Sequence, residues 1–379
     1  MVSKLTLRIN AGEHTRHECP VRLPLPENLP AGPLWLERDG TAARLPAQRV
    51  GDQLLVVLDR LSRGESALYH LASGDEAPGG VRVTESNERL DVAIDGAAFT
   101  SYHVAASGVR PYFYPLLGPG GVAMTRSYPM LKDVAGESRD HPHHRSLYVA
   151  FGEVNGVNVW AEGSEGGVGR IVHRGWDGLV DGPAGADLRE SLQWVDAQDF
   201  SLLDERRHVA VYRTSSVRLL DVEIVLTPSR FGVLFGDTKE GGPLALRINS
   251  ALEGKHGGLI ENAYGGRREA ETWGKRSPWV DYSGALDGSV VGVAIMDHPT
   301  SFRHPTYWHV RDYGLFAANP FGISAFTGDP AQRGEVVLIP GQTLTFRYRV
   351  CLHRGDAAAG EVAEHYHDFA NPPLATWIQ

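Results

Sequence analysis

Short alternating segments between glycines and prolines constrain the fold of this chain more than any other feature. The 379 residues include 44 glycines and 23 prolines, which interrupt the sequence along its whole length. Between them, segments such as Leu344–Leu352 and Asp221–Leu226 alternate apolar and polar side chains with a period of two. A half-buried antiparallel strand shows this alternation, because successive side chains point to opposite faces. The sequence therefore predicts many short strands.

Helical periodicity is scarce and is clearest near the C-terminus, over residues 357–369. Asp356 is expected to cap this helix, and Asn371-Pro372-Pro373 to end it. We therefore predict an all-β protein, a large antiparallel β-sandwich with a small N-terminal β unit and a short C-terminal helix. The Gly- and Pro-rich stretch 74–80 predicts a boundary, which gives an N-terminal domain (1–75), a main sandwich (81–355) and a C-terminal helix and tail (356–379).

Composition excludes several classes of partner. Apolar residues make up 42% and charged residues 22%, values typical of a folded globular chain. The formal net charge is −9 without any long basic block, so neither nucleic acid nor an anionic membrane surface is an expected partner. We see no apolar run long enough for a transmembrane helix and no apolar signal core at the N-terminus. Only two cysteines occur, Cys19 and Cys351, which fits a reducing compartment, and the cytoplasm is the expected location.

The densest group of titratable side chains is Asp140-His141-Pro142-His143-His144-Arg145-Ser146. On an extended strand, His141 and His143 would point the same way and His144 the opposite way. Pro142 makes a central strand position unsuitable, so we expect the segment to lead into a strand at Leu147–Phe151. Imidazole groups near pH 7 serve either acid–base catalysis or metal binding, whereas the structural alternative is a solvated turn.

A two-residue hairpin follows at Asn155-Gly156, a dipeptide typical of tight turns between strands. The hairpin is expected to hold Glu153 close to Asn158, a few residues beyond the histidines. A carboxylate near several imidazoles is a reasonable acid or base. An exposed hairpin charge is the equally simple structural explanation.

The segment Trp273–Tyr282 sets two tryptophans around Lys275 and Arg276. Indole faces stack on sugar C–H groups, while guanidinium groups bind hydroxyls, so Arg276 and Trp279 are candidates for sugar binding. The alternative is the edge of a tryptophan-rich core that is capped by cations.

A second polar and aromatic segment runs from Asp297 to Tyr313 and contains three histidines. From Tyr307 onward it is expected to form a strand that places His309 and Arg311 on one face and Trp308 on the other. Because unpaired charges in a dry core are costly, we expect the His and Arg face to line a polar cleft. A solvated sheet face is the structural alternative.

Several common motifs are absent from the sequence. There is no glycine-rich phosphate loop, no dinucleotide-binding fingerprint after a strand and no GxSxG elbow. Metal binding by His141 and His143 would need a third ligand from elsewhere, and no CxxC or HExxH motif supports it. Nucleotide chemistry and the usual serine-hydrolase layout are therefore disfavoured.

The combined motifs resemble the PmoA-like family, which carries the label "methane oxygenase PmoA". The resemblance covers about residues 80–355 and rests on these segments: Arg110–Pro115, Thr125-Arg126, Asp140–Ser146, Gly152–Gly156, Trp273–Arg276, Asp297–Pro299 and Asn319–Gly322. It implies a bacterial protein associated with carbohydrate utilisation and a supersandwich similar to that of galactose mutarotase-like proteins. This chain has Glu153 where many relatives are expected to have Asp.

Together these observations predict an enzyme that cleaves or rearranges a glycoside or oxidised sugar, as a glycosidase, lyase or epimerase. The expected acid–base residues are His143, His144, Glu153 and His309. The expected substrate-binding residues are Arg126, Arg145, Asn155, Arg276, Trp279, Trp308 and Arg311. A metal-dependent oxygenase or hydrolase using His141, His143 and His309 stays open, as does a non-catalytic sugar-binding protein. The expected partner is a small sugar, and no cofactor is expected unless the metal alternative holds.

Overall fold

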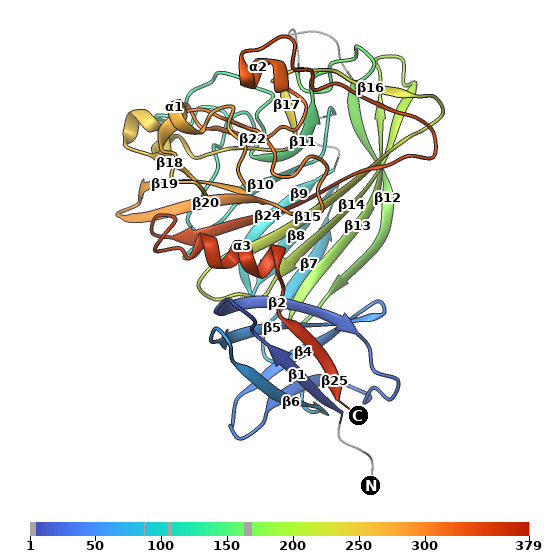
Figure 1. The fold of residues 1–379 in the computed structure, drawn as a ribbon, viewed down its shortest axis with the longest axis vertical. Helices are drawn as coiled ribbons and strands as arrows, with labels where there is room; N and C mark the ends of the chain where they lie inside the picture. Colours follow the sequence, from blue (N-terminus) through green and yellow to red (C-terminus); the bar gives the residue numbers. More distant parts are fainter. Residues whose placement is uncertain (1–4, 87, 105–107, 163–168, 379) are drawn as a thin grey trace.

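The computed structural model describes residues 5–86, 88–104, 108–162 and 169–378. Strands make up 51% and helices 7%, so the predicted all-β class is confirmed. The strand pairs of its three large sheets are antiparallel. Figure 1 shows one sheet at one end of the molecule and a two-sheet sandwich above it.

The sheet at the lower end, called here the N-terminal sheet, has seven strands. In spatial order they are β2 (Arg16–Pro24), β5 (Gln53–Leu61), β4 (Arg44–Val50), β3 (Leu34–Arg38), β6 (Ser66–Ser73), β1 (Thr6–Asn10) and β25 (Leu374–Ile378). Its alternating apolar residues, including Leu7, Leu36 and Val56, form a core of their own.

The sandwich consists of two eight-stranded sheets. The first, called the β11 sheet, has the order β21 (Trp308–Val310), β22 (Leu315–Ala318), β17 (Gly241–Arg247), β11 (Leu147–Phe151), β10 (Tyr112–Leu116), β9 (Ala97–His103), β8 (Arg89–Ile94) and β7 (Val81–Ser86). The second, called the β14 sheet, has the order β12 (Arg170–Asp181), β13 (Gly185–Val195), β14 (Ser201–Tyr212), β15 (Arg218–Pro228), β24 (Leu344–Arg354), β20 (Ser289–Asp297), β19 (Trp279–Leu286) and β18 (Leu259–Asn262).

The main core lies between these two sheets. Leu147, Val149 and Leu246 of the β11 sheet pack with residues such as Val209 and Ile224 of the β14 sheet. Because strands alternate, residues next to these in sequence point to the opposite face of the β11 sheet. That outer face carries a separate buried cluster, and the candidate site lies there.

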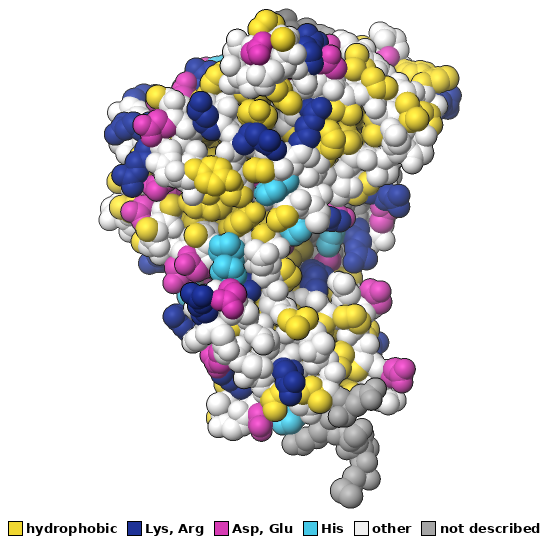
Figure 2. All heavy atoms as spheres, viewed as in Figure 1, with side chains coloured by type: hydrophobic (Ala, Val, Ile, Leu, Met, Phe, Trp, Pro, Cys, Tyr) yellow, Lys and Arg dark blue, Asp and Glu magenta, His cyan; other side chains and the backbone are white. Residues whose placement is uncertain are grey.

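The remaining elements are short. Among the described residues they are the two-stranded ribbon β16 (Val233–Phe235) and β23 (Val336–Leu338), the α-helices α1 (Arg268–Thr272), α2 (Ile323–Thr327) and α3 (Val362–Ala370), and the 3-10 helices η2 (Ser250–Leu252) and η3 (Gly254–His256). Helix α3 lies between the sandwich and the N-terminal sheet in Figure 1. Figure 2 shows cationic side chains among apolar ones over the upper half of the molecule, and acidic side chains scattered over the same view.

The predicted strands at Leu344–Leu352 and Asp221–Leu226 are confirmed as parts of β24 and β15. The predicted C-terminal helix exists but begins at Val362, because Glu361 has a left-handed φ of 50°. Asp356 caps only the preceding turn, where it accepts a hydrogen bond from the backbone N–H of Ala359 at 2.9 Å.

The C-terminal tail is a strand, which the sequence prediction missed. Leu374–Ile378 pairs with β1, whose residues lie at the other end of the chain, so no local pattern could reveal the pairing. The boundaries at residues 75, 81 and 355 stay predictions, and residues 1–4 and 379 of the outer units lie outside the described residues. The structure contains no helix that is long and apolar enough to cross a membrane, as far as the described residues show.

Polar contacts join the N-terminal sheet to the sandwich and α3. Arg16 pairs with Asp368 of α3 at 3.0 Å, and Arg22 pairs with Asp187 of β13 at 2.7 Å. The Gln48 side-chain oxygen accepts hydrogen bonds from two backbone N–H groups at the start of β13. The N-terminal sheet is therefore held against the sandwich by buried, directional contacts.

Candidate functional site

Cross-strand register brings distant residues into one row on the outer face of the β11 sheet. Tyr112 faces Tyr148, which faces Ala245. Ala245 faces Ala317, which in turn faces His309 on the edge strand β21. Directly opposed residues in antiparallel strands share a face. Residues from five strands therefore stand side by side.

Small side chains occupy the middle of this row and large polar ones its two ends. Ala245 and Ala317 separate the Tyr148 side chain from the His309 side chain. Three strand spacings at about 4.8 Å each put roughly 14 Å between the backbones of Tyr148 and His309. Tyr148 is in contact with Trp160, whose ring centroid lies 5.4 Å from its own.

His309 has a fixed tautomer. Its Nδ1 lies 2.8 Å from the carbonyl oxygen of Lys239, and because a carbonyl only accepts, Nδ1 carries the proton. The Nε2 atom then presents a lone pair, and it is buried without a hydrogen-bond partner among the described residues. Burial lowers the pKa of His309 to about 4, although the nearby charge of Glu240 acts in the opposite direction. His309 is therefore a neutral imidazole with an available basic nitrogen at pH 7.

Glu240 is the carboxylate whose charge acts most strongly on the His309 imidazole. Burial raises the pKa of Glu240, but the ion pair with Lys239 and the charges of His309 and His143 outweigh burial and lower it. The Gly152 N–H donates to the Glu240 carbonyl oxygen at 2.9 Å, which fixes this residue beside the end of β11. Glu240 therefore lies where it acts on both His143 and His309.

The three histidines of residues 141–144 gather instead of alternating. The segment is a turn, with His141 at a left-handed φ of 45°, and the expected extended arrangement is wrong. Ring centroids are 4.4 Å apart for His143 and His144 and 4.8 Å apart for His141 and His144. The predicted strand after the turn is confirmed as β11. Pro142 and the turn together bring all three rings to one place.

Two of these histidines have strongly lowered pKa values. Burial, followed by the charges of Arg110 and His141, lowers the pKa of His143 to about 3. Burial, followed by His143 and Arg247, lowers the pKa of His144 well below its usual value. The Nδ1 of His144 accepts a hydrogen bond from Arg247 at 3.2 Å, so its Nε2 carries the proton. His144 is thus a neutral donor, whereas His309 is a neutral acceptor.

Fully buried arginines hold the histidine turn in place. Arg110 donates to the carbonyl oxygens of His143, Val159, Trp160 and Ala161. Arg126 donates to the carbonyl oxygens of Tyr128 and His141. Arg126 and Arg110 therefore position the site, and neither presents its guanidinium to solvent.

Asp140 and Glu162 are the shared carboxylates of these arginines. Asp140 pairs with Arg126 at 2.5 Å and with Arg247 at 3.0 Å. Burial raises the pKa of Asp140, but the hydrogen bond from His141 and the guanidiniums hold it well below its usual range. Glu162 pairs with Arg110 at 3.1 Å and accepts a bidentate contact from Arg145, whose Nε donates to Oε1 and whose Nη2 donates to Oε2.

Tyr313 and Trp160 complete the aromatic part of the site. The Tyr313 ring stacks on His141 at 5.3 Å and lies under the guanidiniums of Arg247 at 4.8 Å and Arg311 at 5.4 Å. The hydroxyl of Tyr148 and the Nε1 of Trp160 are buried without hydrogen-bond partners among the described residues. The Nε1 of Trp273 is likewise buried without a hydrogen-bond partner among the described residues. The Trp273 ring meets the His309 ring edge-on, with 6.3 Å between their centroids.

The structure does not bring Glu153 or Asn155 to this face. The Asn155-Gly156 hairpin is confirmed, with φ values of 52° and 76°. The Glu153 side chain lies against Gly236, and its charge acts on Arg333. The Asn155 side chain accepts a hydrogen bond from the Leu234 N–H at 2.7 Å. Both residues fasten the hairpin to β16.

Arg276 and the two predicted stacking tryptophans also lie apart from the histidines. Arg276 donates to the carbonyl oxygens of Arg303, His304 and Pro305 and so clamps a loop. Trp308 is fully buried in the sandwich core and donates to the Ser277 carbonyl oxygen. Trp279 packs in a buried cluster that includes Val362 of α3. The faces of both tryptophans are covered because β21 is buried on both sides and Trp279 is buried at the start of β19.

Of the predicted residues, the structure gathers His143, His144, Arg126, Arg145, His309 and Arg311 around the outer face. Sequence reasoning missed Glu240, Tyr148, Trp160, Arg247 and Tyr313. Only Arg247 and Tyr313 could have been found from strand alternation. Arg247 lies two residues after Ala245 on β17, and Tyr313 lies two residues before Leu315 of β22, so each shares a face with its neighbour. Nothing local marks Glu240, which reaches the site through the packing of β17 against β11.

No group of three His, Cys, Asp or Glu side chains within the described ranges is arranged to hold a metal ion. The histidine turn supplies three rings, but their close edge and face contacts leave them packed against each other.

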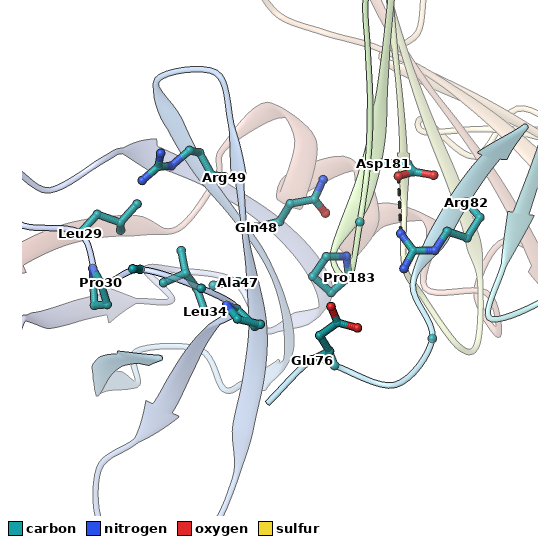
Figure 3. A pocket seen from close by; sticks show the side chains of 16 residues that line it. Leu29, Pro30, Leu34, Ala47, Gln48, Arg49, Glu76, Arg82, Asp181 and Pro183 are labelled. Carbon is teal, nitrogen blue, oxygen red and sulfur yellow. Dashed lines mark hydrogen bonds and ion pairs between the residues drawn. The ribbon is translucent and has the colours of Figure 1, made fainter. Parts of the chain in front are cut away.

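A separate cleft of about 610 Å³ lies between the N-terminal sheet and the sandwich. Figure 3 shows that Gln48 and Glu76 point toward Pro183, and that Arg82 and Asp181 form a pair on one wall. The cleft contains no histidine and none of the predicted site residues.

The fold and the outer face define an all-β protein with a two-sheet sandwich and a cluster of buried, neutral imidazoles beside a carboxylate. By sequence, the chain belongs to a family of unknown function, DUF6807, whose model matches residues 89–367. The resemblance to the PmoA-like family stays a prediction, because the matching description does not mention it.

No curated protein matches the chain. The chain is similar at 11% identity to a glycosyl hydrolase family 38 protein from Enterococcus faecalis, with a TM-score of 0.41 over 100% of this chain and 48% of that one. The chain is also similar to an α-mannosidase from Enterococcus faecalis V583, at 11% identity and with a TM-score of 0.40 over 99% of this chain and 46% of that one. A third similar structure is a putative aldose 1-epimerase from Escherichia coli K12, at 11% identity and with a TM-score of 0.27 over 73% of this chain and 99% of that one. The chain spans about half the length of the first two, and such TM-scores carry no functional argument.

Proposed function

We propose that the protein is a carbohydrate-active enzyme that cleaves or rearranges a glycoside or an oxidised sugar on the outer face of the β11 sheet. In this proposal the Nε2 atom of His309 accepts a proton from the substrate. Glu240 stabilises the imidazolium that forms, and His144 donates through its Nε2–H. A positioned base of this kind contributes about 10²–10⁴-fold to the rate.

The observation that carries the proposal is the basic nitrogen of His309. Its partner nitrogen is engaged by a backbone carbonyl, and its own lone pair is buried without a partner among the described residues. Buried polar atoms are normally satisfied, and exceptions often mark a functional group. A proton acceptor held in one tautomer suits acid–base catalysis.

The neighbouring atoms favour a hydroxylated substrate. The indole N–H of Trp273 donates next to the accepting Nε2 of His309, and a hydroxyl group both donates and accepts. At the other end of the row, the Nε1 of Trp160 and the Tyr148 hydroxyl offer a similar combination. Aromatic rings beside hydrogen-bonding atoms suit the apolar faces and polar edges of sugars.

Ligand binding and turnover test the proposal together. Thermal unfolding is measured with millimolar aldoses, ketoses, uronates and methyl glycosides, and each mixture is analysed by NMR for conversion. We expect at least one sugar class to raise the Tm and to be converted. The variant His309→Gln should bind this sugar and lose conversion.

The matched control is His365→Gln, which alters a buried histidine of α3 outside the outer face. This variant should keep the conversion rate of the native protein. Binding without conversion would show a sugar-binding protein instead of an enzyme. Stoichiometric iron, copper or zinc in protein purified without a nickel column would favour the metal-dependent alternative, and absence of any sugar effect would reject the proposal.

A further inference from the structure

Four guanidinium groups surround the histidine turn. Arg110, Arg126 and Arg247 have side chains that are 0% exposed, and the side chain of Arg145 is 16% exposed. They share two carboxylates, because Asp140 serves Arg126 and Arg247 while Glu162 serves Arg110 and Arg145. The cluster therefore holds twice as many guanidiniums as shared carboxylates.

Most of the remaining acids near the site have further cations of their own. Glu137 is the exception, because it accepts hydrogen bonds from the backbone N–H groups of Ser127 and Tyr128, and its charge acts on Arg126. Glu253 lies 3.5 Å from Arg247 but 2.7 Å from Lys255, and Glu240 pairs with Lys239. Glu269 pairs with Arg311 at 2.8 Å. Once Glu253 and Glu137 are included, the excess is smaller, but a net positive charge remains at the histidine turn.

The histidines add no charge to this cluster, since the low pKa values of His143 and His144 keep them neutral at pH 7. Charges buried in protein act more strongly and over longer distances than charges in water. A fixed positive field of this kind stabilises negative charge that develops on a bound substrate. It opposes positive charge, and glycoside cleavage passes through a cationic, oxocarbenium-like transition state.

We infer that the site abstracts a proton from a sugar carbon that neighbours a carbonyl or carboxyl carbon, and that it does not hydrolyse glycosidic bonds. The inference rests on the proposed function and narrows it to enolate chemistry. The substrate class is a ketose, an aldose in its open form or a uronic acid. The reaction class is isomerisation, epimerisation or β-elimination.

The step balances without a further reactant. The lone pair of the His309 Nε2 takes the proton, and the electrons of the broken C–H bond form a C=C bond to the neighbouring carbon. The carbonyl electrons move to oxygen, where the guanidinium field stabilises the anion. The enolate then regains a proton at carbon, or it expels a leaving group from the next carbon, and His309 gives up its proton in either case.

Charged transition-state mimics test the sign of the field directly. Pentonohydroxamates and hexonohydroxamates resemble the anionic enediolate, whereas deoxynojirimycin and its galacto and manno isomers resemble the cation of glycoside cleavage. We expect a hydroxamate to bind at least tenfold more tightly than every iminosugar by calorimetry. The reverse order would overturn the inference while leaving the proposed function intact.

Solvent deuterium reports the bond that breaks. The protein is incubated in D₂O with ketoses, aldoses and uronates, and NMR follows loss of the proton next to the carbonyl or carboxyl carbon. We expect exchange at that position, and its loss in His309→Gln. Hydrolysis of a glycoside without deuterium incorporation would reject the inference only, whereas no binding and no conversion of any sugar would reject the proposed function as well.

A pair of variants separates field effects from misfolding. Arg145→Gln reduces the positive excess and should weaken hydroxamate binding about tenfold, while Glu162→Gln increases the excess and should not weaken it. Arg347→Gln, which alters an arginine paired with Glu223 on the β14 sheet, is the matched control. Equal losses in all three variants would overturn the inference.

Discussion

The carbonyl oxygen of Lys239 accepts the Nδ1–H of His309 across 2.8 Å. The next residue, Glu240, raises the pKa of the same imidazole against the effect of burial. Two consecutive residues before β17 therefore set which nitrogen of His309 carries the proton and how strongly the other one holds a proton. Such an arrangement leaves a signature in the pH dependence of the reaction.

The acid limb of the rate profile should report His309. Its pKa of about 4 means that Nε2 is unprotonated at neutral pH. We expect kcat/KM to stay constant as the pH falls from 7 and to drop about tenfold per pH unit once the pH passes below about 4. The variant Glu240→Gln removes the charge that raises this pKa, so its acid limb should move to lower pH. A limb near pH 6.5 would assign the base to a different group.

Stability should decrease as the solution is acidified through the range of the ordinary histidine pKa. His143 has a pKa of about 3 in the folded protein, below the usual value of 6.5, so the unfolded chain binds the proton first. The contribution of neutral His143 to the free energy of unfolding is therefore fully present above pH 6.5, and it is lost progressively as the pH falls toward 3. At pH 5 this residue alone costs about 2 kcal/mol of unfolding free energy.

Urea unfolding at pH 7 and pH 5 measures this loss, and His143→Gln is expected to reduce it by about 2 kcal/mol. The comparison is made within each variant, so that any constant loss of packing cancels. An unchanged difference between the two pH values would contradict the buried, neutral state of His143.

Arg110 should be needed for the stability of the fold and not only for catalysis. Its guanidinium is fully buried, pairs with Glu162 and binds four backbone carbonyl oxygens. Replacing it by Gln leaves a buried carboxylate with one cation fewer, which we expect to cost about 3–5 kcal/mol. Equilibrium unfolding in urea checks this value, and a cost below 1 kcal/mol would show that the contacts are dispensable.

Arg276→Ala should affect stability and spare sugar binding. Its guanidinium clamps the carbonyl oxygens of residues 303–305 and stays exposed to solvent, so a loss of about 1 kcal/mol is expected. Unfolding curves and sugar-induced Tm shifts, measured on the same preparation, distinguish the two effects. A smaller sugar-induced Tm shift in this variant would instead support the sugar-binding role that the sequence predicted for Arg276.

The local features of this chain were predictable from sequence, and their assembly was not. Period-two alternation identified β15 and β24, the Asn-Gly dipeptide identified its turn, and the run of histidines marked the site. The same alternation separated His309 from Trp308 onto opposite faces. It could not show that Trp308 faces the core, because both faces of these strands are covered and sequence alone does not rank them.

The missed residues share one physical cause. Tyr148 and His309 stand in one row, with two alanines between them, because β17 and β22 lie between their strands. Register of this kind is decided by long-range pairing. Glu240 depends on the same pairing. Predicted ligands such as Trp279 failed to reach the site because an aromatic residue beside a cation also describes the edge of a core.

Pairing of β1 with β25 has a consequence for biosynthesis. Strand β1 is synthesised before the sandwich and β25 after it, so β1 must wait for β25 before its free hydrogen-bonding edge is covered. During translation that edge stays open to the wrong neighbours, as unpaired sheet edges do. The order of synthesis thus places completion of the N-terminal sheet after synthesis of the sandwich, and a chain that still lacks β25 is the form most in need of protection from self-association.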